Sequence, residues 1–211
     1  LQDRVPPFAA EEAEKIIQSQ LKKPLHDVIE HLDPHPLGSA YLAQVQAATL
    51  TTGEKVAIKL LRPGIKKTIQ RDLRLLQSLA GWIDTLHPQR SRLRAREVVQ
   101  NYQDTLLGEL NLTLEAGNMS QMHASFTDDS RLSIPRVNWD LSTTEMLVTE
   151  AVSGHNLAEL ESLKKQGVDC HRLATDGIAL FLTQVFEKNF FQHICIFFNY
   201  TFLLFRNLAD L

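Results

Sequence analysis

The chain has few cysteines, little excess of either charge and no long apolar run, and each shortage excludes a class of protein. It holds 2 cysteines in 211 residues. As Cys170 and Cys195 they are too few and too far apart in sequence to indicate a disulfide framework or a zinc site, so a reducing compartment is favoured. The formal net charge is -3, which gives no electrostatic reason to expect a nucleic acid as partner.

Metal-ligand spacings and membrane-spanning runs are also missing. The 8 histidines show no H-E-x-x-H or comparable spacing, so they predict no metal site. The longest apolar candidate, Ile194 to Phe205, is interrupted by Asn199 and Thr201 and is shorter than the roughly 20 residues of a membrane helix. We expect no transmembrane helix. The chain begins with Leu1 and without a signal-peptide pattern, so we expect an internal fragment.

What is present is an ordinary globular composition, 44% hydrophobic and 22% charged, with clear periodic segments. Apolar spacing predicts helices at Ala9 to Leu21, Pro24 to His31, Ile65 to about His87, Glu97 to about Phe126, His155 to Lys165 and Asp169 to about Phe190. Strands are predicted at Tyr41 to Leu50, Lys55 to Leu61, around Arg136 to Trp139 and around Glu145 to Val148. The first two strands form a hairpin through a turn at Gly53.

The most informative segment is Val56-Ala57-Ile58-Lys59, an apolar strand that carries a lysine near its end. It follows the hairpin turn and, before that, the small-residue run Pro36 to Ala40. A loop without bulky side chains can lie close over a polyphosphate, and a rigid strand then aims one ammonium at its oxygens. Sites of the kinase type hold ATP in this way. Taken alone, Lys59 is also compatible with an ordinary surface lysine.

Such a lysine needs an acidic partner on a helix packed against the sheet. The second long helix offers Glu109, Asn111 and Glu115. At about 3.6 residues per turn, Glu109 and Asn111 differ by about 200° around the helix, whereas Asn111 and Glu115 share a face. The sequence therefore predicts that Asn111 and Glu115 point the same way from one continuous helix.

Four separate elements fall in the order and at the spacing of one family. They are Pro36-Leu37-Gly38-Ser39-Ala40-Tyr41-Leu42-Ala43-Gln44-Val45, Val56-Ala57-Ile58-Lys59 with Arg62-Pro63, Glu109-Leu110-Asn111, and Glu115-Ala116-x-Asn118. Together they resemble the UbiB (ADCK-type) atypical kinase-like proteins, over Leu1 to about Gln192.

The resemblance implies roles for single residues in an ATP site. Gly38, Ser39 and Ala40 would lie in the alanine-rich loop that replaces the kinase glycine-rich loop. Lys59 would be the nucleotide lysine, and Glu115 its ion-pair partner. Because Gly38 stands where the family prefers alanine, the loop is expected to be more flexible.

Further positions follow from the same resemblance. Glu109 and Asn111 would be the family's E-x-D/N motif, and Glu150 to Val152 would be the hinge whose backbone meets adenine. Tyr41 replaces a small residue, and it would either crowd the phosphates or point outward.

The implied fold is α+β and protein-kinase-like, an incomplete domain of the atypical type. It would have an N-terminal helical extension over 1–35 and an N-lobe with a β-hairpin and long inserted helices over 36–150. The beginning of a helical C-lobe would cover 151–192, and a divergent apolar tail would cover 193–211.

Parts of the family pattern are missing from the chain. The K-x-G-Q element is absent, and the expected H-A-D-x-H-P-G-N gives way to Gln192-His193-Ile194-Cys195. Phosphoryl transfer of this type needs an aspartate, an asparagine five residues later and a D-F-G-type aspartate for Mg²⁺. No aspartate here is followed by asparagine at that distance, and His193 is read as a structural histidine. We therefore assign no catalytic and no metal-binding residue.

Three hypotheses about function remain open. The chain is part of an ATP-dependent kinase or ATPase, or a non-catalytic module that binds a nucleotide or a partner through Lys59 and Glu115. In the third hypothesis it is a truncated, inactive product whose tail, Ile194 to Leu211, never packs properly. We favour a fragment of an ATP-binding kinase-like protein and leave its own enzymatic activity open.

The family resemblance also implies a cellular setting. It indicates a role in ubiquinone or related isoprenoid-quinone metabolism, with ATP and Mg²⁺ as cofactors. The implied partners are isoprenoid-quinone precursors or their biosynthetic proteins, together with peripheral contact to a membrane. That membrane would be the cytoplasmic side of a bacterial membrane or an organelle, either a plastid or a mitochondrion.

Overall fold

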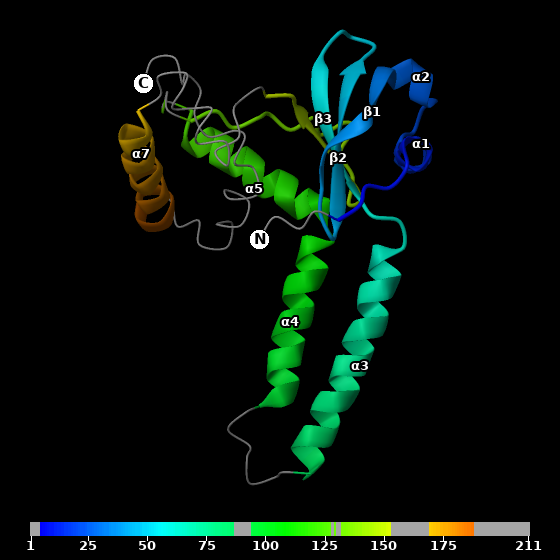
Figure 1. Ribbon diagram of the computed structural model, residues 1–211, viewed down its shortest axis with the longest axis vertical. Helices are drawn as coiled ribbons and strands as arrows, with labels where there is room; N and C mark the ends of the chain where they lie inside the picture. Colours follow the sequence, from blue (N-terminus) through cyan, green and yellow to red (C-terminus); the bar gives the residue numbers. More distant parts are fainter. Residues whose placement is uncertain (1–4, 87–93, 128, 130–131, 153–168, 188–211) are drawn as a thin grey trace. The chain divides into compact units, whose positions relative to one another are not determined.

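The computed structural model describes residues 5–86, 94–127, 129, 132–152 and 169–187, with the backbone alone for 84–86 (Figure 1). Their helices and strands are, in order, α1 (Ala10–Gln20), α2 (Leu25–Val28), β1 (Ile29–Ser39), β2 (Ala43–Leu50), β3 (Lys55–Leu61), α3 (Ile65–Leu86), α4 (Ala95–Glu109), α5 (Leu112–Ser125), β4 (Met146–Glu150), α7 (Cys170–Leu182) and a π-helical segment, η3 (Thr183–Glu187). Mixed helices and an antiparallel sheet give the expected α+β class.

The described residues fall into two compact units. The first comprises those within Leu1–Ala116 and Asn138–Val148, and the second those within Gly117–Val137 and Thr149–Leu211. The sheet and the small-residue run therefore belong to the first unit, apart from the last two residues of β4. The boundaries expected from the sequence, after residues 35, 150 and 192, separate the lobes and terminal segments of a kinase-like domain. They describe a different division from these two compact units, so they stay predictions.

The four-stranded sheet has the order β1-β2-β3-β4. Strands β2 and β3 pair in antiparallel fashion, with Val45 opposite Lys59 and Ala47 opposite Ala57. Gly53 joins them with φ +84, a left-handed conformation that glycine adopts without strain. This confirms the hairpin predicted from the alternation of apolar residues.

Strand β1 corrects one sequence prediction. The helix expected over Pro24 to His31 ends at Val28, and β1, which was not predicted, begins at Ile29 and includes Asp33 to Pro36. Pro34 and Pro36 are tolerated because β1 is an edge strand. Its outer edge has no neighbouring strand in the sheet, so a proline without an N–H donor interrupts no hydrogen bonds there. The register against β2 shifts at three places, and two of them lie beside Pro34 or Pro36, where a proline interrupts regular pairing.

The core of the first unit lies between α1 and one face of the sheet. Its buried residues are Ala13, Ile17, Ile29, Ala48, Leu50, Val56, Ile58, Leu60, Met146 and Val148. Helix α1, predicted at Ala9 to Leu21, lies beside these strands (Figure 1). Alternate residues of β3 enter this core, so Ala57 and Lys59 are directed to the opposite face of the sheet.

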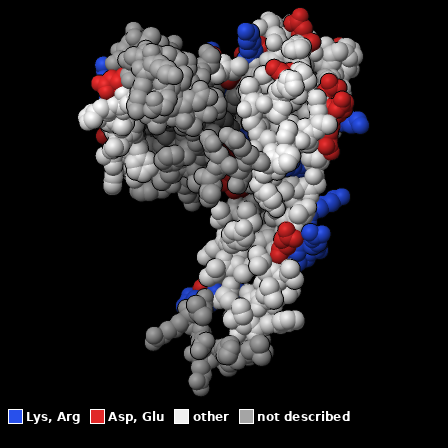
Figure 2. All heavy atoms as spheres, viewed as in Figure 1, with Lys and Arg blue, Asp and Glu red and all other residues white. Residues whose placement is uncertain are grey.

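Helices α3 and α4 lie side by side and extend away from the sheet (Figure 1). Helix α3 confirms the prediction over Ile65 to about His87. Large apolar side chains remain exposed on both helices, namely Leu75, Leu76, Leu79, Trp82 and Ile83 of α3 and Val98, Tyr102 and Leu107 of α4. Figure 2 shows few charged side chains on the face of this helix pair that is in view. The pair therefore exposes large apolar side chains on part of its outer surface.

The single helix predicted from Glu97 to about Phe126 is wrong, because the chain forms two helices there. Helix α4 ends at Glu109, and α5 begins at Leu112. Asn111 separates them and accepts a hydrogen bond on its Oδ1 from the Thr113 N–H, 3.1 Å away. An asparagine that caps the next helix in this way satisfies one of its unpaired N–H groups.

The second unit contains α7 together with most of α5. Asp169 caps it by accepting hydrogen bonds from the N–H groups of His171 and Arg172. The predicted helix at Asp169 to about Phe190 is observed to Leu182 and continues as η3. A small core contains Phe126, Leu132 and Leu180, with Ile134 against it.

Four further predictions concern the chain after Pro135. The strand expected around Arg136 to Trp139 is reduced to a single bridge between Val137 and Thr149, whereas the strand expected around Glu145 to Val148 is β4. The helix predicted over His155 to Lys165 and the tail at 193–211 lie outside the described residues. Among the residues that are described, no helix combines the length and the apolar character needed to cross a membrane.

Candidate nucleotide site

The candidate site is built on the face of β2 and β3 that is turned away from the core. Lys59 stands there, with Val45 opposite it on β2 and Ala57 two residues before it on β3. All three side chains are partly buried. The site therefore consists of one cation next to small, apolar residues on a rigid strand pair.

Glu115 meets Lys59 on this face. The Lys59 Nζ lies 2.7 Å from one carboxylate oxygen of Glu115 and 2.8 Å from the other. The two side chains are 24% and 13% exposed, so water screens the pair less than it screens an ordinary surface ion pair. The contact fixes the position of the ammonium while leaving part of the lysine accessible.

Helix α5 delivers Glu115 from its first turn. An acidic side chain is favoured there, because the N-terminal end of a helix carries partial positive charge. Asn111 caps the same helix end, so its amide oxygen faces the backbone of α5. Asn111 and Glu115 therefore do not lie on one continuous helix as predicted, since the helix is interrupted at Asn111.

The start of α5 is bound to the turn that leads into β4. The Leu112 N–H donates to the carbonyl of Thr144, 3.0 Å away, and the Leu61 N–H at the end of β3 donates to the carbonyl of Glu145, 3.1 Å away. One turn thus holds both the strand that carries Lys59 and the helix that carries Glu115.

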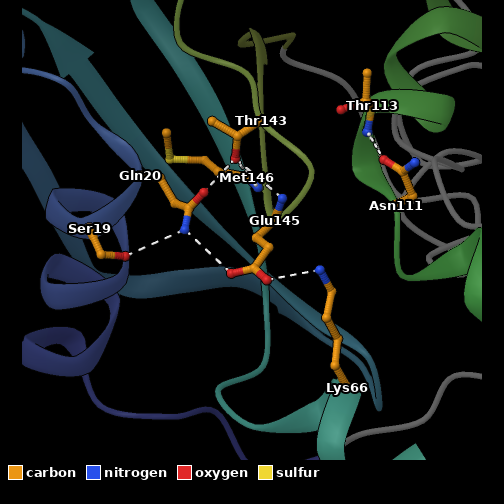
Figure 3. A network of polar contacts seen from close by, with 8 residues as sticks. All are labelled: Ser19, Gln20, Lys66, Asn111, Thr113, Thr143, Glu145 and Met146. Carbon is orange, nitrogen blue, oxygen red and sulfur yellow. Dashed lines mark hydrogen bonds and ion pairs between the residues drawn. The ribbon is translucent and has the colours of Figure 1, made fainter. Parts of the chain in front are cut away.

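Side chains from two helices, α1 and α3, hold this turn in place (Figure 3). The Glu145 carboxylate accepts from Lys66 Nζ at 2.9 Å and from Gln20 Nε2 at 3.3 Å. Thr143 Oγ1 donates to Gln20 Oε1 at 2.7 Å and accepts from the N–H groups of Glu145 and Met146. Sequence analysis missed this network, because its members lie in α1, α3 and the turn and form no local pattern.

The small-residue run ends at the turn between β1 and β2. Gly38 and Ser39 are the last residues of β1, and Ala40 follows. A Cβ built on Gly38 would meet no atom within 4 Å, so alanine would fit at this position. Tyr41 is 53% exposed, which places most of its side chain in solvent.

The remaining predicted site residues lie elsewhere on the described chain. Glu109 is the exposed last residue of α4. Glu150 ends β4, and its Oε2 accepts from Arg136 Nε at 3.4 Å. Val152 follows it and is partly buried. Glu150 and Val152 belong to the second unit, and their part in a hinge stays a prediction.

The residues present fit a polyphosphate better than they fit a metal ion. A fixed, partly exposed ammonium beside small side chains suits phosphate oxygens. In contrast, the described part of the chain contains no group of three or more His, Cys, Asp or Glu side chains that could hold a metal ion. The described residues therefore offer no such cluster as a ligand set for Mg²⁺.

A strand lysine paired with a glutamate on a helix packed against an antiparallel sheet is the arrangement of the N-terminal lobe of kinase-like proteins. Comparison with known proteins agrees with this class. The chain belongs to the ABC1 atypical kinase-like domain family, whose model matches residues 1–193.

Relatives and a solved structure give the same assignment. The chain is 42% identical over 192 residues to a probable protein kinase UbiB of Marinobacter nauticus, covering 91% of this chain and 35% of that protein. It is 41% identical over 193 residues to the protein of the same name from Erwinia tasmaniensis, with the same coverage of 91% and 35%. The chain thus spans about a third of the length of these relatives.

The solved structure is a Mycobacterium tuberculosis protein determined in complex with erythromycin. It superposes with a TM-score of 0.62 at 25% sequence identity, over 73% of this chain and 38% of that chain. The family expected from the sequence and its kinase-like fold are therefore confirmed.

Proposed function

We propose that this chain binds ATP through Lys59, as part of the nucleotide-binding lobe of a UbiB-type atypical kinase or ATPase. The observation that carries the proposal is the pair of contacts, 2.7 and 2.8 Å, between the Lys59 ammonium and the Glu115 carboxylate. Without an acidic partner, a long lysine side chain samples many rotamers. The carboxylate reduces this freedom before ligand arrives, so less entropy is lost on binding.

The face around Lys59 also suits the rest of the nucleotide. Val45, Ala47 and Ala57 are partly buried on the same side of β2 and β3 as the lysine. Small and β-branched apolar side chains leave room for a flat base to lie against the strands, and they add apolar contact area. The loop residues Gly38, Ser39 and Ala40 would then lie over the phosphates.

The role of the whole protein is part of the same proposal. Relatives are named as probable protein kinases of the UbiB type, and that name supports a place in ubiquinone or related isoprenoid-quinone biosynthesis. Because the chain spans 35% of these relatives, phosphoryl transfer, Mg²⁺ binding and contact with quinone precursors, biosynthetic proteins or a membrane surface are proposed for the longer protein.

The proposal is tested by calorimetric titration of the chain with ATP, with and without Mg²⁺. Lys59→Ala should weaken ATP binding by at least about tenfold, because a charge-assisted contact to phosphate is lost. Lys55→Ala is the matched control, since Lys55 is an exposed lysine on the same strand and the same face. Equal affinities for the two variants would contradict an ATP site at Lys59.

A further inference from the structure

Arg62 joins two segments that are far apart in sequence. Its Nε donates to the carbonyl of Ala40 at 2.8 Å, and its Nη2 donates to Ser39 Oγ at 2.6 Å and to the carbonyl of Pro6 at 2.9 Å. The guanidinium carbon also lies 5.8 Å from the centroid of the Phe8 ring. One side chain therefore contacts both the end of β1 and the residues before α1.

Gln44 makes a second connection to the same N-terminal residues. It is 0% exposed and exchanges two hydrogen bonds with the backbone of Phe8. The Phe8 N–H donates to Gln44 Oε1 at 2.9 Å, and Gln44 Nε2 donates to the Phe8 carbonyl at 3.3 Å. The Pro6–Phe8 segment is thus held from β2 by Gln44 and from the end of β3 by Arg62.

Arg62 also holds both ends of the turn between β1 and β2. Its backbone N–H donates to the carbonyl of Leu42 at 2.9 Å, while its side chain holds Ala40. Within the turn, the Ala40 N–H donates to the Ala43 carbonyl, also at 2.9 Å. Only a planar guanidinium presents several donors in a fixed fork, so lysine could not make this set of contacts.

We propose that Arg62 is a positioning residue that sets the nucleotide affinity of the Lys59 site, by holding the Ser39–Leu42 turn against the Pro6–Phe8 segment. The inference rests on the proposed function. Lys59 lies on β3, three residues before Arg62. The Ser39–Leu42 turn leads from β1 into β2, and β2 pairs with β3, the strand of Lys59. A turn that is already ordered loses less conformational freedom when it closes over phosphates.

The consequence is a connection between the residues before α1 and ATP binding. Release of Pro6–Phe8 would remove one of the side-chain acceptors of Arg62 and both hydrogen bonds of Gln44. The turn would then sample more conformations, and ATP would bind more weakly although no group in contact with it had changed.

The test combines amide hydrogen exchange with ATP titration of the full chain. In Arg62→Gln, the amides of Phe8 and Ala40 should exchange about tenfold faster, and ATP should bind about tenfold more weakly, the factor expected for losing a charge-assisted hydrogen bond. Arg62→Lys should behave like Arg62→Gln, because charge alone does not restore the fork. Ser39→Ala, which removes one contact, provides a milder change in the same direction.

Two controls separate positioning from loss of stability. Arg71→Gln removes an exposed arginine of α3 that pairs with its neighbour Asp72, and it should change neither readout. The Leu21 amide, bonded to the Ile17 carbonyl at the end of α1, should exchange at the same rate in every variant.

Three results would overturn the inference. They are unchanged exchange at Phe8 and Ala40 in Arg62→Gln, an equal acceleration at Leu21, or faster exchange with unaltered ATP affinity. If the unaltered chain binds no ATP, the proposed function fails and this inference fails with it. The exchange rates then still show whether Arg62 holds the turn, so the two failures can be told apart.

Discussion

At the scale of single residues, the Lys59–Glu115 pair combines a structural and a proposed binding role. Both groups have lost part of their hydration, and each replaces it with the other's charge at 2.7 to 2.8 Å. Removing one member of a partly buried pair leaves the other poorly solvated. The pair should therefore contribute measurably to stability even without a ligand.

We expect Glu115→Gln to lower the free energy of unfolding by about 1–3 kcal/mol, because a partly buried hydrogen bond between two charged groups is weakened. Urea denaturation measures this. Glu97→Gln provides the matched control, because Glu97 pairs with Arg94 on the exposed surface of α4, where an ion pair contributes less than about 1 kcal/mol. Equal losses in the two variants would show that burial of the Lys59 pair has no energetic weight.

Two buried glutamines of β2 offer a second comparison. Gln44 and Gln46 are both 0% exposed and project from the same face of the strand. Gln44 uses both ends of its amide on Phe8. Gln46 Nε2 donates to the Asp33 carbonyl at 3.3 Å, whereas its buried Oε1 has no hydrogen-bond partner.

We therefore expect Gln44→Met to cost about 1–3 kcal/mol of unfolding free energy and Gln46→Met to cost less, because the second substitution also removes an unsatisfied oxygen. Thermal and urea unfolding of the two variants provide the measurement. A larger loss for Gln46→Met would mean that its amide is better satisfied than these contacts indicate.

Sequence reasoning at this scale succeeded where a motif was local and failed where a partner was a distant backbone group. Lys59 and Glu115 were identified through a family pattern, and the structure brings them into contact. Arg62 was noticed only beside Pro63, since its acceptors are carbonyls and a hydroxyl in other segments. Glu145 was placed in a strand, and its contacts with α1 and α3 depend on how these helices pack.

At the scale of elements, the position of α5 determines where Glu115 lies. The helix starts after a break at Asn111 and is anchored through the Leu112 N–H to Thr144. Leu110 and Leu112 are both buried, which a continuous helix would place about 200° apart. The break lets both side chains reach the interior, and a cap makes it stable.

Asn111→Ala should destabilise the chain by about 1 kcal/mol through loss of the α5 cap. Asn111→Asp should retain most of that stability, because a carboxylate also caps and suits the helix dipole. Asn101→Ala, at an exposed position inside α4, should be neutral or slightly stabilising. Unfolding followed by circular dichroism gives the values, and a harmless Asn111→Ala would rule out the capping role.

Helix α7 supplies a pH-dependent element. The hydrogen bond from the Arg172 N–H, followed by that from His171, holds the pKa of Asp169 below its ordinary value of 3.8. A carboxyl with a lowered pKa in the folded state stabilises the fold above its unfolded pKa, and this contribution is lost as the pH falls through the folded pKa.

The stability difference between the unaltered chain and Asp169→Asn should accordingly be constant above about pH 3.8 and shrink below it. Asparagine caps without titrating, so it isolates the charge. Hydrogen exchange of the Leu173 amide, which is bonded to the Asp169 carbonyl, follows α7 directly. If the unfolding free energies of the two proteins changed by the same amount across this pH range, the Asp169 charge would not be the cause of the pH dependence.

The elements show why some parts of the fold could be predicted. The β2–β3 hairpin has regular alternation and a glycine turn, so local rules were sufficient. Strand β1 contains Pro34 and Pro36, which are typical of turns, and its edge position became visible only with the sheet. The break between α4 and α5 could not be predicted from the sequence, because apolar residues continue at helical spacing on both sides of it. The break allows Leu110 and Leu112 both to be buried, and that burial depends on tertiary packing.

At the scale of the whole molecule, the chain is an ABC1-family segment whose described residues form two compact units. The first unit contains the sheet, Lys59 and Glu115, together with the Arg62 contacts that join the turn to Pro6–Phe8. We therefore expect bound ATP to contact the β2–β3 face that carries Lys59. The core around Leu180 of α7 is not expected to change its structure when ATP binds.

The most direct measurement of this account is a titration of the isotope-labelled chain with ATP, followed by nuclear magnetic resonance of its backbone amides. We predict that the largest shifts fall on Val45, Ala47, Ala57 and Lys59 and on the Ser39–Leu42 turn, and that Lys59→Ala needs at least about tenfold more ATP to produce them. Shifts that appear at the same ATP concentrations in Lys59→Ala, or that centre on α3, α4 or α7, would contradict the proposed ATP site.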